Sequence, residues 1–148
     1  MKRTKLAAAA AGILIGGIVL WSVLRPGPEP AVAPPGGGPA QGAAMAEVRL
    51  PAALSEDAQI GKSVYEAKCA SCHGANAAGQ EGTAPPLVHK IYEPGHHSDA
   101  AFLLAAKNGV RAHHWRFGNM PPVPGVTDAE VRYVVRYVRE LQEENGIR

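Results

Sequence analysis

Two cysteines and a histidine lie within five consecutive residues, Cys69-Ala70-Ser71-Cys72-His73. Two thiols about one helical turn apart can add to the two vinyl groups of one porphyrin, and a histidine directly after the second thiol can ligate the iron beneath the ring. The spacing therefore predicts one covalently attached haem, held by Cys69 and Cys72, with His73 as the proximal iron ligand. A redox-active dithiol and half of a zinc site are the alternatives that so short a motif leaves open.

The cysteine content and the composition narrow these alternatives. Cys69 and Cys72 are the only cysteines among 148 residues, which excludes a disulfide framework and a zinc site built from four cysteines. A redox dithiol typically lies beside a βαβ unit, and the sequence has no alternating strand pattern. Aromatic residues make up 5% of the chain, whereas glycine and proline number 17 and 13. A small domain of this composition has few large apolar side chains to form a core, and a large apolar cofactor would complete that core.

Positive charge is concentrated near the N-terminus. The formal net charge is +2. Four of the basic residues flank the first apolar segment: Lys2, Arg3, Lys5 and Arg25. From residue 45 onward the chain has 11 Lys and Arg against 12 Asp and Glu. We therefore expect no nucleic-acid partner, because no basic patch is large enough to follow a phosphate backbone.

Residues 1–24 have the properties of a membrane anchor. Residues 6–24 contain no charged side chain, and a helix of this length would span roughly 28 Å, about one bilayer core. Basic residues precede this run, and Trp21 lies near its far end, as expected at an interface. These features predict a single-pass helix in a bacterial cytoplasmic (inner) membrane, with the remainder on the periplasmic, outer face. A cleaved signal peptide is the alternative, although the nearest small-residue site, 31–33, is followed by Pro34 and would be cleaved poorly.

Residues 25–50 are predicted to be a linker. Six prolines lie between residues 26 and 39, and Gly36-Gly37-Gly38 interrupts them. Such a sequence cannot bury a core and is expected to be partly polyproline II and partly flexible coil. The linker would let the domain formed by residues 51–148 reach neighbouring proteins above the membrane.

Three helices are expected in residues 51–148. The first follows Ser55, a favourable N-cap with acidic residues after it, and its inward face should carry two stripes: Ile60 with Val64, and Gly61 with Tyr65. The second should run from Ser98-Asp99 to Asn108-Gly109, with an apolar side made of Phe102, Leu103 and Ala106.

The third helix should begin at the capping box Thr127-Asp128-Ala129-Glu130. A stripe at helical spacing follows: Val131, Val134, Val135, Val138 and Leu141. Another face carries Arg132, Arg136 and Arg139, which we expect to be solvated and paired with Glu140, Glu143 or Glu144. A docking patch for a partner is the less favoured interpretation of these arginines.

With the motif and the helices in this order, residues 55–142 resemble a class I monohaem c-type cytochrome in a membrane-anchored form. The resemblance implies an all-α, small cytochrome c fold around one covalent haem c. In that family a glycine of the N-terminal helix crosses an aromatic residue of the C-terminal helix; Gly61 and Tyr137 match these positions. The segment Ala84-Pro85-Pro86-Leu87 is similar to the loop whose backbone carbonyl holds the proximal histidine, which places Pro85 beside His73 Nδ1.

The resemblance also implies a distal iron ligand. Asn119-Met120-Pro121-Pro122 is similar to the family's methionine loop, and a thioether would raise the potential and close the iron to substrates. Met1 and Met45 compete poorly, while the alternative for Met120 is an ordinary core methionine. Trp115 is expected to pack on the haem or to cap its propionates.

Two histidine doublets, His96-His97 and His113-His114, complicate this assignment. His113 or His114 could replace methionine as the distal ligand and lower the potential. The doublets could also bind copper or zinc between them, although adjacent residues rarely chelate one ion well. Exposed loop histidines are the simplest interpretation, and the sequence leaves their role open. His89 has no partner in the sequence.

These inferences predict a tethered carrier of single electrons rather than an enzyme. In a respiratory or photosynthetic-type chain, its expected electron donor is a quinol-oxidising complex or dehydrogenase, and its expected acceptor is a terminal oxidase or reductase. Residues 6–24 are expected to contact the lipid bilayer. No small-molecule substrate is expected at the iron. A fixed haem subunit of a larger membrane oxidoreductase is the main alternative, and a haem sensor or small peroxidase is a further one.

Overall fold

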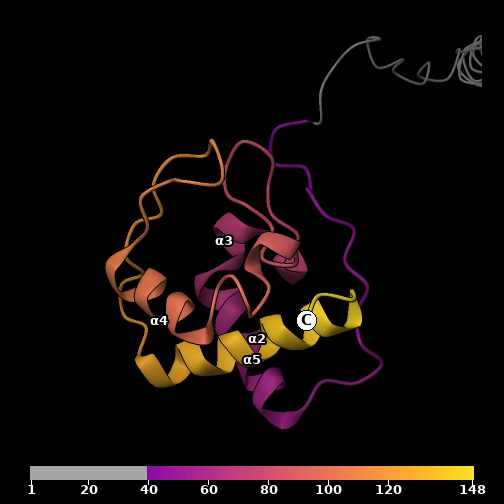
Figure 1. Cartoon of the computed structure of the whole chain (residues 1–148). Coiled ribbons are helices and arrows are strands. Elements are labelled where there is room, and N and C mark those ends of the chain that lie inside the picture. The colour runs from indigo at the N-terminus through magenta and orange to yellow at the C-terminus, as the bar shows by residue number, and fades with distance from the viewer. Residues whose placement is uncertain (1–39) are drawn as a thin grey trace, which may run out of the picture. The chain divides into compact units, whose positions relative to one another are not determined.

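Helices joined by long loops make up residues 40–148, the part of the chain that the computed structural model describes (Figure 1). In chain order they are α2 (Glu56–Lys68), α3 (Ala70–His73), the 3-10 helices η1 (Ala75–Ala77) and η2 (Lys90–Tyr92), α4 (Asp99–Asn108) and α5 (Asp128–Glu144). Strand-like pairing within these residues is limited to two isolated bridges, Gln80 with Ala84 and Val110 with Met120. The expected all-α class is confirmed for this part of the chain.

The predicted membrane anchor, residues 1–24, and the first part of the predicted linker, residues 25–39, lie outside the described residues. Within residues 40–148 no helix has the length and apolar character needed to cross a membrane.

The three predicted helices are present with the expected ends. Ser55 caps α2, its hydroxyl accepting a hydrogen bond from the Ala58 N–H at 3.3 Å. Thr127 and Glu130 form the reciprocal capping box at the start of α5. Helix α4 follows Ser98, whose side chain makes no capping hydrogen bond, and ends at Gly109, whose φ of 74° is accessible mainly to glycine. Side-chain capping therefore locates the starts of α2 and α5 along the chain.

The apolar stripe of α5 forms one side of the core. All five of its predicted members are buried: Val131, Val134, Val135, Val138 and Leu141. Ala58 and Tyr65 of α2 pack with Val134, Val138 and Leu141. Ala106 of α4 and the partly buried Phe102 and Leu103 pack with Val131 and Val135. Helix α5 thus contacts both α2 and α4 (Figure 1).

Helices α2 and α5 cross at Gly61. A Cβ atom at this residue would lie 1.9 Å from the backbone oxygen of Tyr133, so only glycine permits the approach. The predicted glycine at the crossing is therefore confirmed, but its nearest atoms belong to the backbone of Tyr133 and Val134 rather than to the expected Tyr137. Tyr137 instead packs its ring against Tyr65, with 5.6 Å between the centroids.

Ile60 was expected to face inward but is 47% exposed. Helix α2 buries Ala58, Gly61 and Tyr65, which lie three and four residues apart on the face toward α5. Ile60 lies about 100° around the helix from Gly61, so this face turns it toward solvent. Val64 is partly buried against the core, as predicted.

The prediction that Arg139 is solvated is wrong, since this side chain is buried. Its guanidinium donates hydrogen bonds to the backbone oxygens of Tyr92 at 2.7 Å and His97 at 2.6 Å, and to Asp99 at 2.8 Å. A buried charge is tolerated because these acceptors replace water. The expected pairing is found for Arg136, which lies 2.9 Å from Glu140.

The end of the predicted linker packs against the domain. Met45 and Ala46 both donate backbone hydrogen bonds to the Ala78 oxygen at 3.0 Å, and Gly42 donates to Glu81 at 2.8 Å. Arg49 exchanges hydrogen bonds with the Asn145 side chain near the end of α5. Residues 42–49 therefore belong structurally with the domain, because backbone pairing with its loops holds them in place.

Candidate haem-binding site

The junction of α2 and α3 presents the Cys-x-x-Cys-His motif. Helix α2 ends at Cys69, and the short helix α3 continues to His73, with backbone hydrogen bonds from Cys72 (3.1 Å) and His73 (2.9 Å) to the Cys69 oxygen. The two thiols are free, Cys69 partly buried and Cys72 exposed. This turn fixes the two sulfurs and the imidazole on one short segment, which covalent attachment of a porphyrin requires.

The His73 ring is oriented by the backbone of Pro85. His73 is buried, and its Nδ1 lies 2.9 Å from the Pro85 oxygen. A carbonyl can only accept, so Nδ1–H donates and the lone pair of Nε2 is left available for a metal. Burial lowers the pKa of His73, and the Pro85 hydrogen bond only partly offsets this effect, so the ring is neutral as a ligand must be. The expected contact between Pro85 and His73 is present.

Three further contacts hold the motif in shape. The Gln80 amide donates to the backbone oxygens of Ala70 and Ser71, both at 3.1 Å. The Tyr65 hydroxyl donates to the Gly74 oxygen at 2.8 Å, directly after the histidine. Nothing local in the sequence distinguishes Gln80 from a solvated glutamine, so its role could not be predicted.

The environment of Cys69 is unsuited to dithiol redox chemistry. Burial, reinforced by the neighbouring Cys72, raises the pKa of the Cys69 thiol to about 11. Redox-active Cys-x-x-Cys motifs instead depend on a lowered thiol pKa that supplies the thiolate. The dithiol alternative therefore loses support.

The predicted distal ligand, Met120, lies on a loop fixed against the end of α4. Its backbone pairs with Val110 through hydrogen bonds of 2.9 and 3.0 Å, and a Cβ at Gly109 would lie 2.5 Å from the Met120 oxygen. The Asn119 side chain accepts a further hydrogen bond from the Ala112 N–H at 2.9 Å. The loop therefore holds the Met120 backbone in one position, while ligation of iron by its sulfur stays a prediction.

Trp115 carries a buried polar atom without a partner. Its ring stacks on Phe117, with centroids 5.9 Å apart, and forms a T-shaped pair with the His89 ring, with centroids 5.2 Å apart. The indole Nε1–H is buried and has no hydrogen-bond acceptor within residues 40–148. Tyr92 lies nearby, but the geometry between the two side chains falls short of a hydrogen bond. A buried donor of this kind is expected to have a partner, and a ligand oxygen would supply one.

The residues present fit a covalently bound haem. The two thiols lie one turn apart, the His73 Nε2 is available, and the unpaired Trp115 donor matches a propionate oxygen. When bound, the haem supplies a one-electron iron couple. Cys69 and Cys72 would hold the ring, His73 would ligate the iron with Pro85 fixing its orientation, and Trp115 would pack and donate at the edge.

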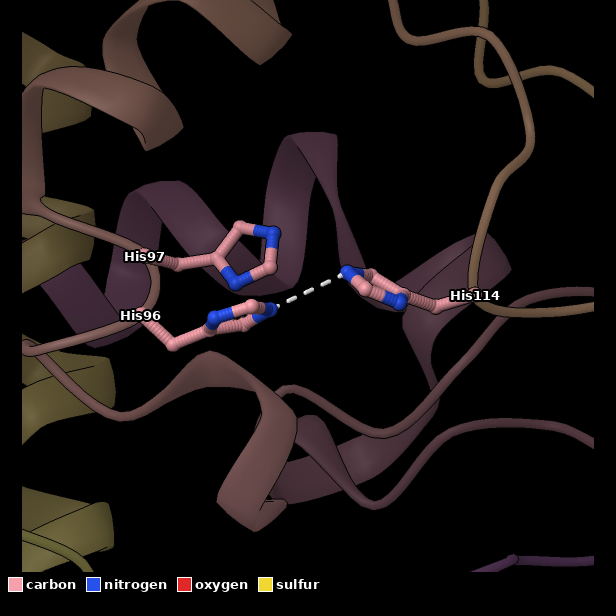
Figure 2. A group of neighbouring side chains, drawn as sticks. All are labelled: His96, His97 and His114. Atoms are coloured by element: carbon pink, nitrogen blue, oxygen red, sulfur yellow. Dashed lines mark hydrogen bonds between the residues drawn. The ribbon is translucent and has the colours of Figure 1, made fainter.

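The two histidine doublets, His96-His97 and His113-His114, contact each other. The His96 and His114 Nε2 atoms are 3.3 Å apart, and the His97 and His113 rings stack with 6.2 Å between centroids (Figure 2 shows three of the four rings). Both doublets are visible in the sequence, but only the paths of the loops bring them together.

The chain matches a known protein family. The family model described as cytochrome c matches residues 58–142, which include the Cys-x-x-Cys-His motif, Pro85, Trp115, Met120 and most of α5. A search among curated proteins found no match.

Proposed function

Because the chain belongs to the cytochrome c family, we propose that it is a membrane-tethered monohaem carrier that passes single electrons between redox proteins on the periplasmic face of a bacterial inner membrane. Family membership gives covalently bound haem c and haem-based electron transfer. The tether, the location and the partners are the parts that we propose.

One observation carries the assignment of the haem site. His73 is buried and held through Nδ1 by the Pro85 oxygen at 2.9 Å, directly after the two free thiols. A fixed imidazole changes its position little between two oxidation states of a metal, which keeps the energy of reorganisation low during electron transfer. The chain's contribution is thus a rigid proximal side.

We assign the distal side to Met120. The short bridge to Val110 and the two prolines that follow Met120 restrict this loop. A neutral thioether favours ferrous iron and leaves no open position for oxygen or a substrate. This proposal favours a carrier over a haem sensor or a peroxidase, both of which need an open distal site.

Residues 6–24 support the tether, since they form an uncharged run that is long enough to span a bilayer and is preceded by basic residues. Residues 25–41 would then connect this anchor to the domain. The proposed donor is a quinol-oxidising complex or dehydrogenase, and the proposed acceptor is a terminal oxidase or reductase. Small, weak interfaces are typical of such encounters.

The experiment is an optical spectrum of the oxidised, haem-loaded protein, for the wild type and for Met120→His. A weak far-red band reports ligation of ferric haem by methionine, so we expect it in the wild type and expect its loss in the variant. Met45→Leu is the matched control and should retain the band. A wild type without the band, or one that binds carbon monoxide readily when reduced, would contradict the closed Met120 site.

The tether is tested separately. Full-length protein should sediment with membranes and have the intact mass of residues 1–148 plus one covalent haem, whereas a version in which a cleavable signal replaces residues 1–24 should be released in soluble form. Isolation of the protein in a stoichiometric complex that survives gel filtration in mild detergent would instead favour the fixed-subunit alternative.

A further inference from the structure

Histidines from two separate segments converge at one place outside the haem site. His96 and His97 directly precede α4, and His114 lies in the loop between α4 and α5. One ring nitrogen from each of these three residues lies within 4.8 Å of the others. Figure 2 shows the His96 and His97 rings side by side, with the His114 ring approaching from the opposite side. The loops therefore form a cluster that neither doublet could form alone.

Two nitrogens of the cluster have the spacing of ligands in a tetrahedral metal site. The His96 and His114 Nε2 atoms face each other at 3.3 Å. With Zn–N bonds of about 2.0–2.1 Å and tetrahedral angles, two ligand nitrogens lie roughly 3.3–3.4 Å apart. Adjacent ligands in a square-planar site would lie about 2.8 Å apart. The pair is thus spaced for zinc, whereas nitrogens of the cluster are up to 4.8 Å apart. Closing a separation of 4.8 Å to tetrahedral spacing would require ring movements that total about 1.4 Å.

A backbone acceptor fixes which ring nitrogen of His97 carries the proton. Its Nδ1–H donates to the Ile91 oxygen at 2.7 Å, which leaves Nε2 as the nitrogen with a free lone pair. Its backbone is fixed as well, because its N–H donates to the Glu93 oxygen at 2.8 Å and its oxygen accepts from Arg139 at 2.6 Å. A hydrogen bond from Nδ1–H to a backbone carbonyl is the usual support of a zinc-bound histidine.

We propose that His96, His97 and His114 bind one Zn²⁺ ion through their ring nitrogens, with solvent in the fourth position. Zinc accepts three imidazoles and a water molecule in a tetrahedral arrangement. His96 and His114 are exposed, so the ion has a path from solvent and room for the water. The proposed zinc ligands differ from His73 and Met120, the residues proposed to ligate the haem iron, so both sites can be occupied together when Met120 is the distal ligand.

The main competing account is a proton shared between two imidazoles. At 3.3 Å the His96 and His114 nitrogens can form an N–H···N hydrogen bond without a metal. Partial desolvation, together with the nearby His113, His97 and His96, lowers the pKa of His114, which favours its neutral form. Neutral imidazole is also the form that zinc needs, so binding and the shared proton exclude each other.

A bound Zn²⁺ ion would link two loops of the domain. The ion would join the segment before α4 to the loop that carries Trp115 and continues to Met120. A ligand that binds only the folded state raises the unfolding temperature in proportion to the logarithm of its concentration. Zinc is therefore expected to stabilise the wild type measurably.

The test is a calorimetric titration of Zn²⁺ into full-length, haem-loaded protein, purified with a chelator and without a histidine tag. We expect one equivalent to bind, and we expect His96→Ala, His97→Ala or His114→Ala each to weaken binding at least tenfold. The control is His89→Asn, which removes a histidine outside the cluster and keeps an acceptor for the Ile91 N–H; it should bind as the wild type does. Unchanged haem absorption would show that each variant has folded.

Two results would overturn the proposal. The first is a wild type that binds no more zinc, and gains no more thermal stability from it, than a variant in which all three histidines are alanine. The second is binding that the single substitutions leave unchanged, which would place the ion elsewhere.

Discussion

Gly61 of α2 and Tyr133 of α5 meet backbone to backbone. A Cβ at Gly61 would lie 1.9 Å from the Tyr133 carbonyl oxygen and 2.4 Å from its carbonyl carbon. Neither atom can rotate away, so a side chain at this position must push the two helices apart. Helix α2 ends at Cys69, and α5 contributes much of the core. The crossing of α2 and α5 therefore supports both the fold and the haem site.

Gly61→Ala is therefore expected to lower the free energy of unfolding by about 3 kcal/mol, since overpacking outweighs the roughly 1 kcal/mol that alanine gains in helix propensity. Guanidinium unfolding of the haem-loaded protein measures the change. Gly95→Ala is the control, because a Cβ there meets nothing within 4 Å; it should change stability by less than about 0.5 kcal/mol. Equal unfolding midpoints for the two variants would mean that the helices do not cross this closely.

The helices and the haem motif could be predicted because their signals are local. The cap at Ser55, the box at Thr127 and Glu130, and the valine stripe of α5 all lie within one or two turns of the structure that they specify. The contact of Pro85 with His73 came from the family resemblance, which carries long-range information that a single sequence lacks.

Arg139 and the histidine cluster could not be predicted because their partners are set by loop paths. Arg139 bonds to backbone oxygens more than 40 residues away, and every residue offers such an oxygen. His96 and His114 are 18 residues apart, and only the turn of the chain around α4 brings them together. Spacing on a helix says nothing about either relationship.

Arg139 is expected to matter through its buried hydrogen bonds rather than through its ion pair. Arg139→Met would leave the oxygens of Tyr92 and His97 without this donor and should cost about 3 kcal/mol. Asp99 is 68% exposed in its side chain, so Asp99→Asn should cost at most about 0.5 kcal/mol. Thermal unfolding of both variants checks the difference. Equal losses of stability in the two variants would show that the ion pair with Asp99 provides most of the stabilisation by Arg139.

The unpaired indole of Trp115 predicts an effect on the redox potential. If its Nε1–H donates to a haem propionate, Trp115→Phe leaves more negative charge near the iron and favours the ferric form. The midpoint potential should fall by ~30 mV, which for one electron is about a threefold change in the equilibrium constant for reduction. Phe117→Leu removes the stacked ring but keeps the donor, so it is the control and should leave the potential nearly unchanged. A fall of the same size in both variants would point to packing alone.

Glu140 links α5 to the start of α2 and predicts a dependence of stability on pH. Its carboxylate accepts hydrogen bonds from the Ser55 hydroxyl at 2.6 Å and the Ser55 N–H at 3.0 Å. Burial alone would raise the pKa of Glu140, but these bonds and the Arg136 guanidinium outweigh it and hold the pKa below its ordinary value. The unfolded chain therefore binds a proton more readily than the folded one. The stabilisation is complete above the ordinary pKa of about 4.3 and is lost as the pH falls through the lowered folded value.

Glu140→Gln should accordingly lower the free energy of unfolding by about 1–2 kcal/mol at pH 7, because a neutral amide replaces a charge-assisted acceptor. The difference from the wild type should shrink in acid, where the wild-type carboxyl becomes protonated. Guanidinium unfolding at pH 7 and near pH 3 provides the comparison, with the exposed Glu143→Gln as the control that should show no such trend. If Glu140→Gln lowered the free energy of unfolding by the same amount at both pH values, the negative charge of Glu140 would not stabilise the fold.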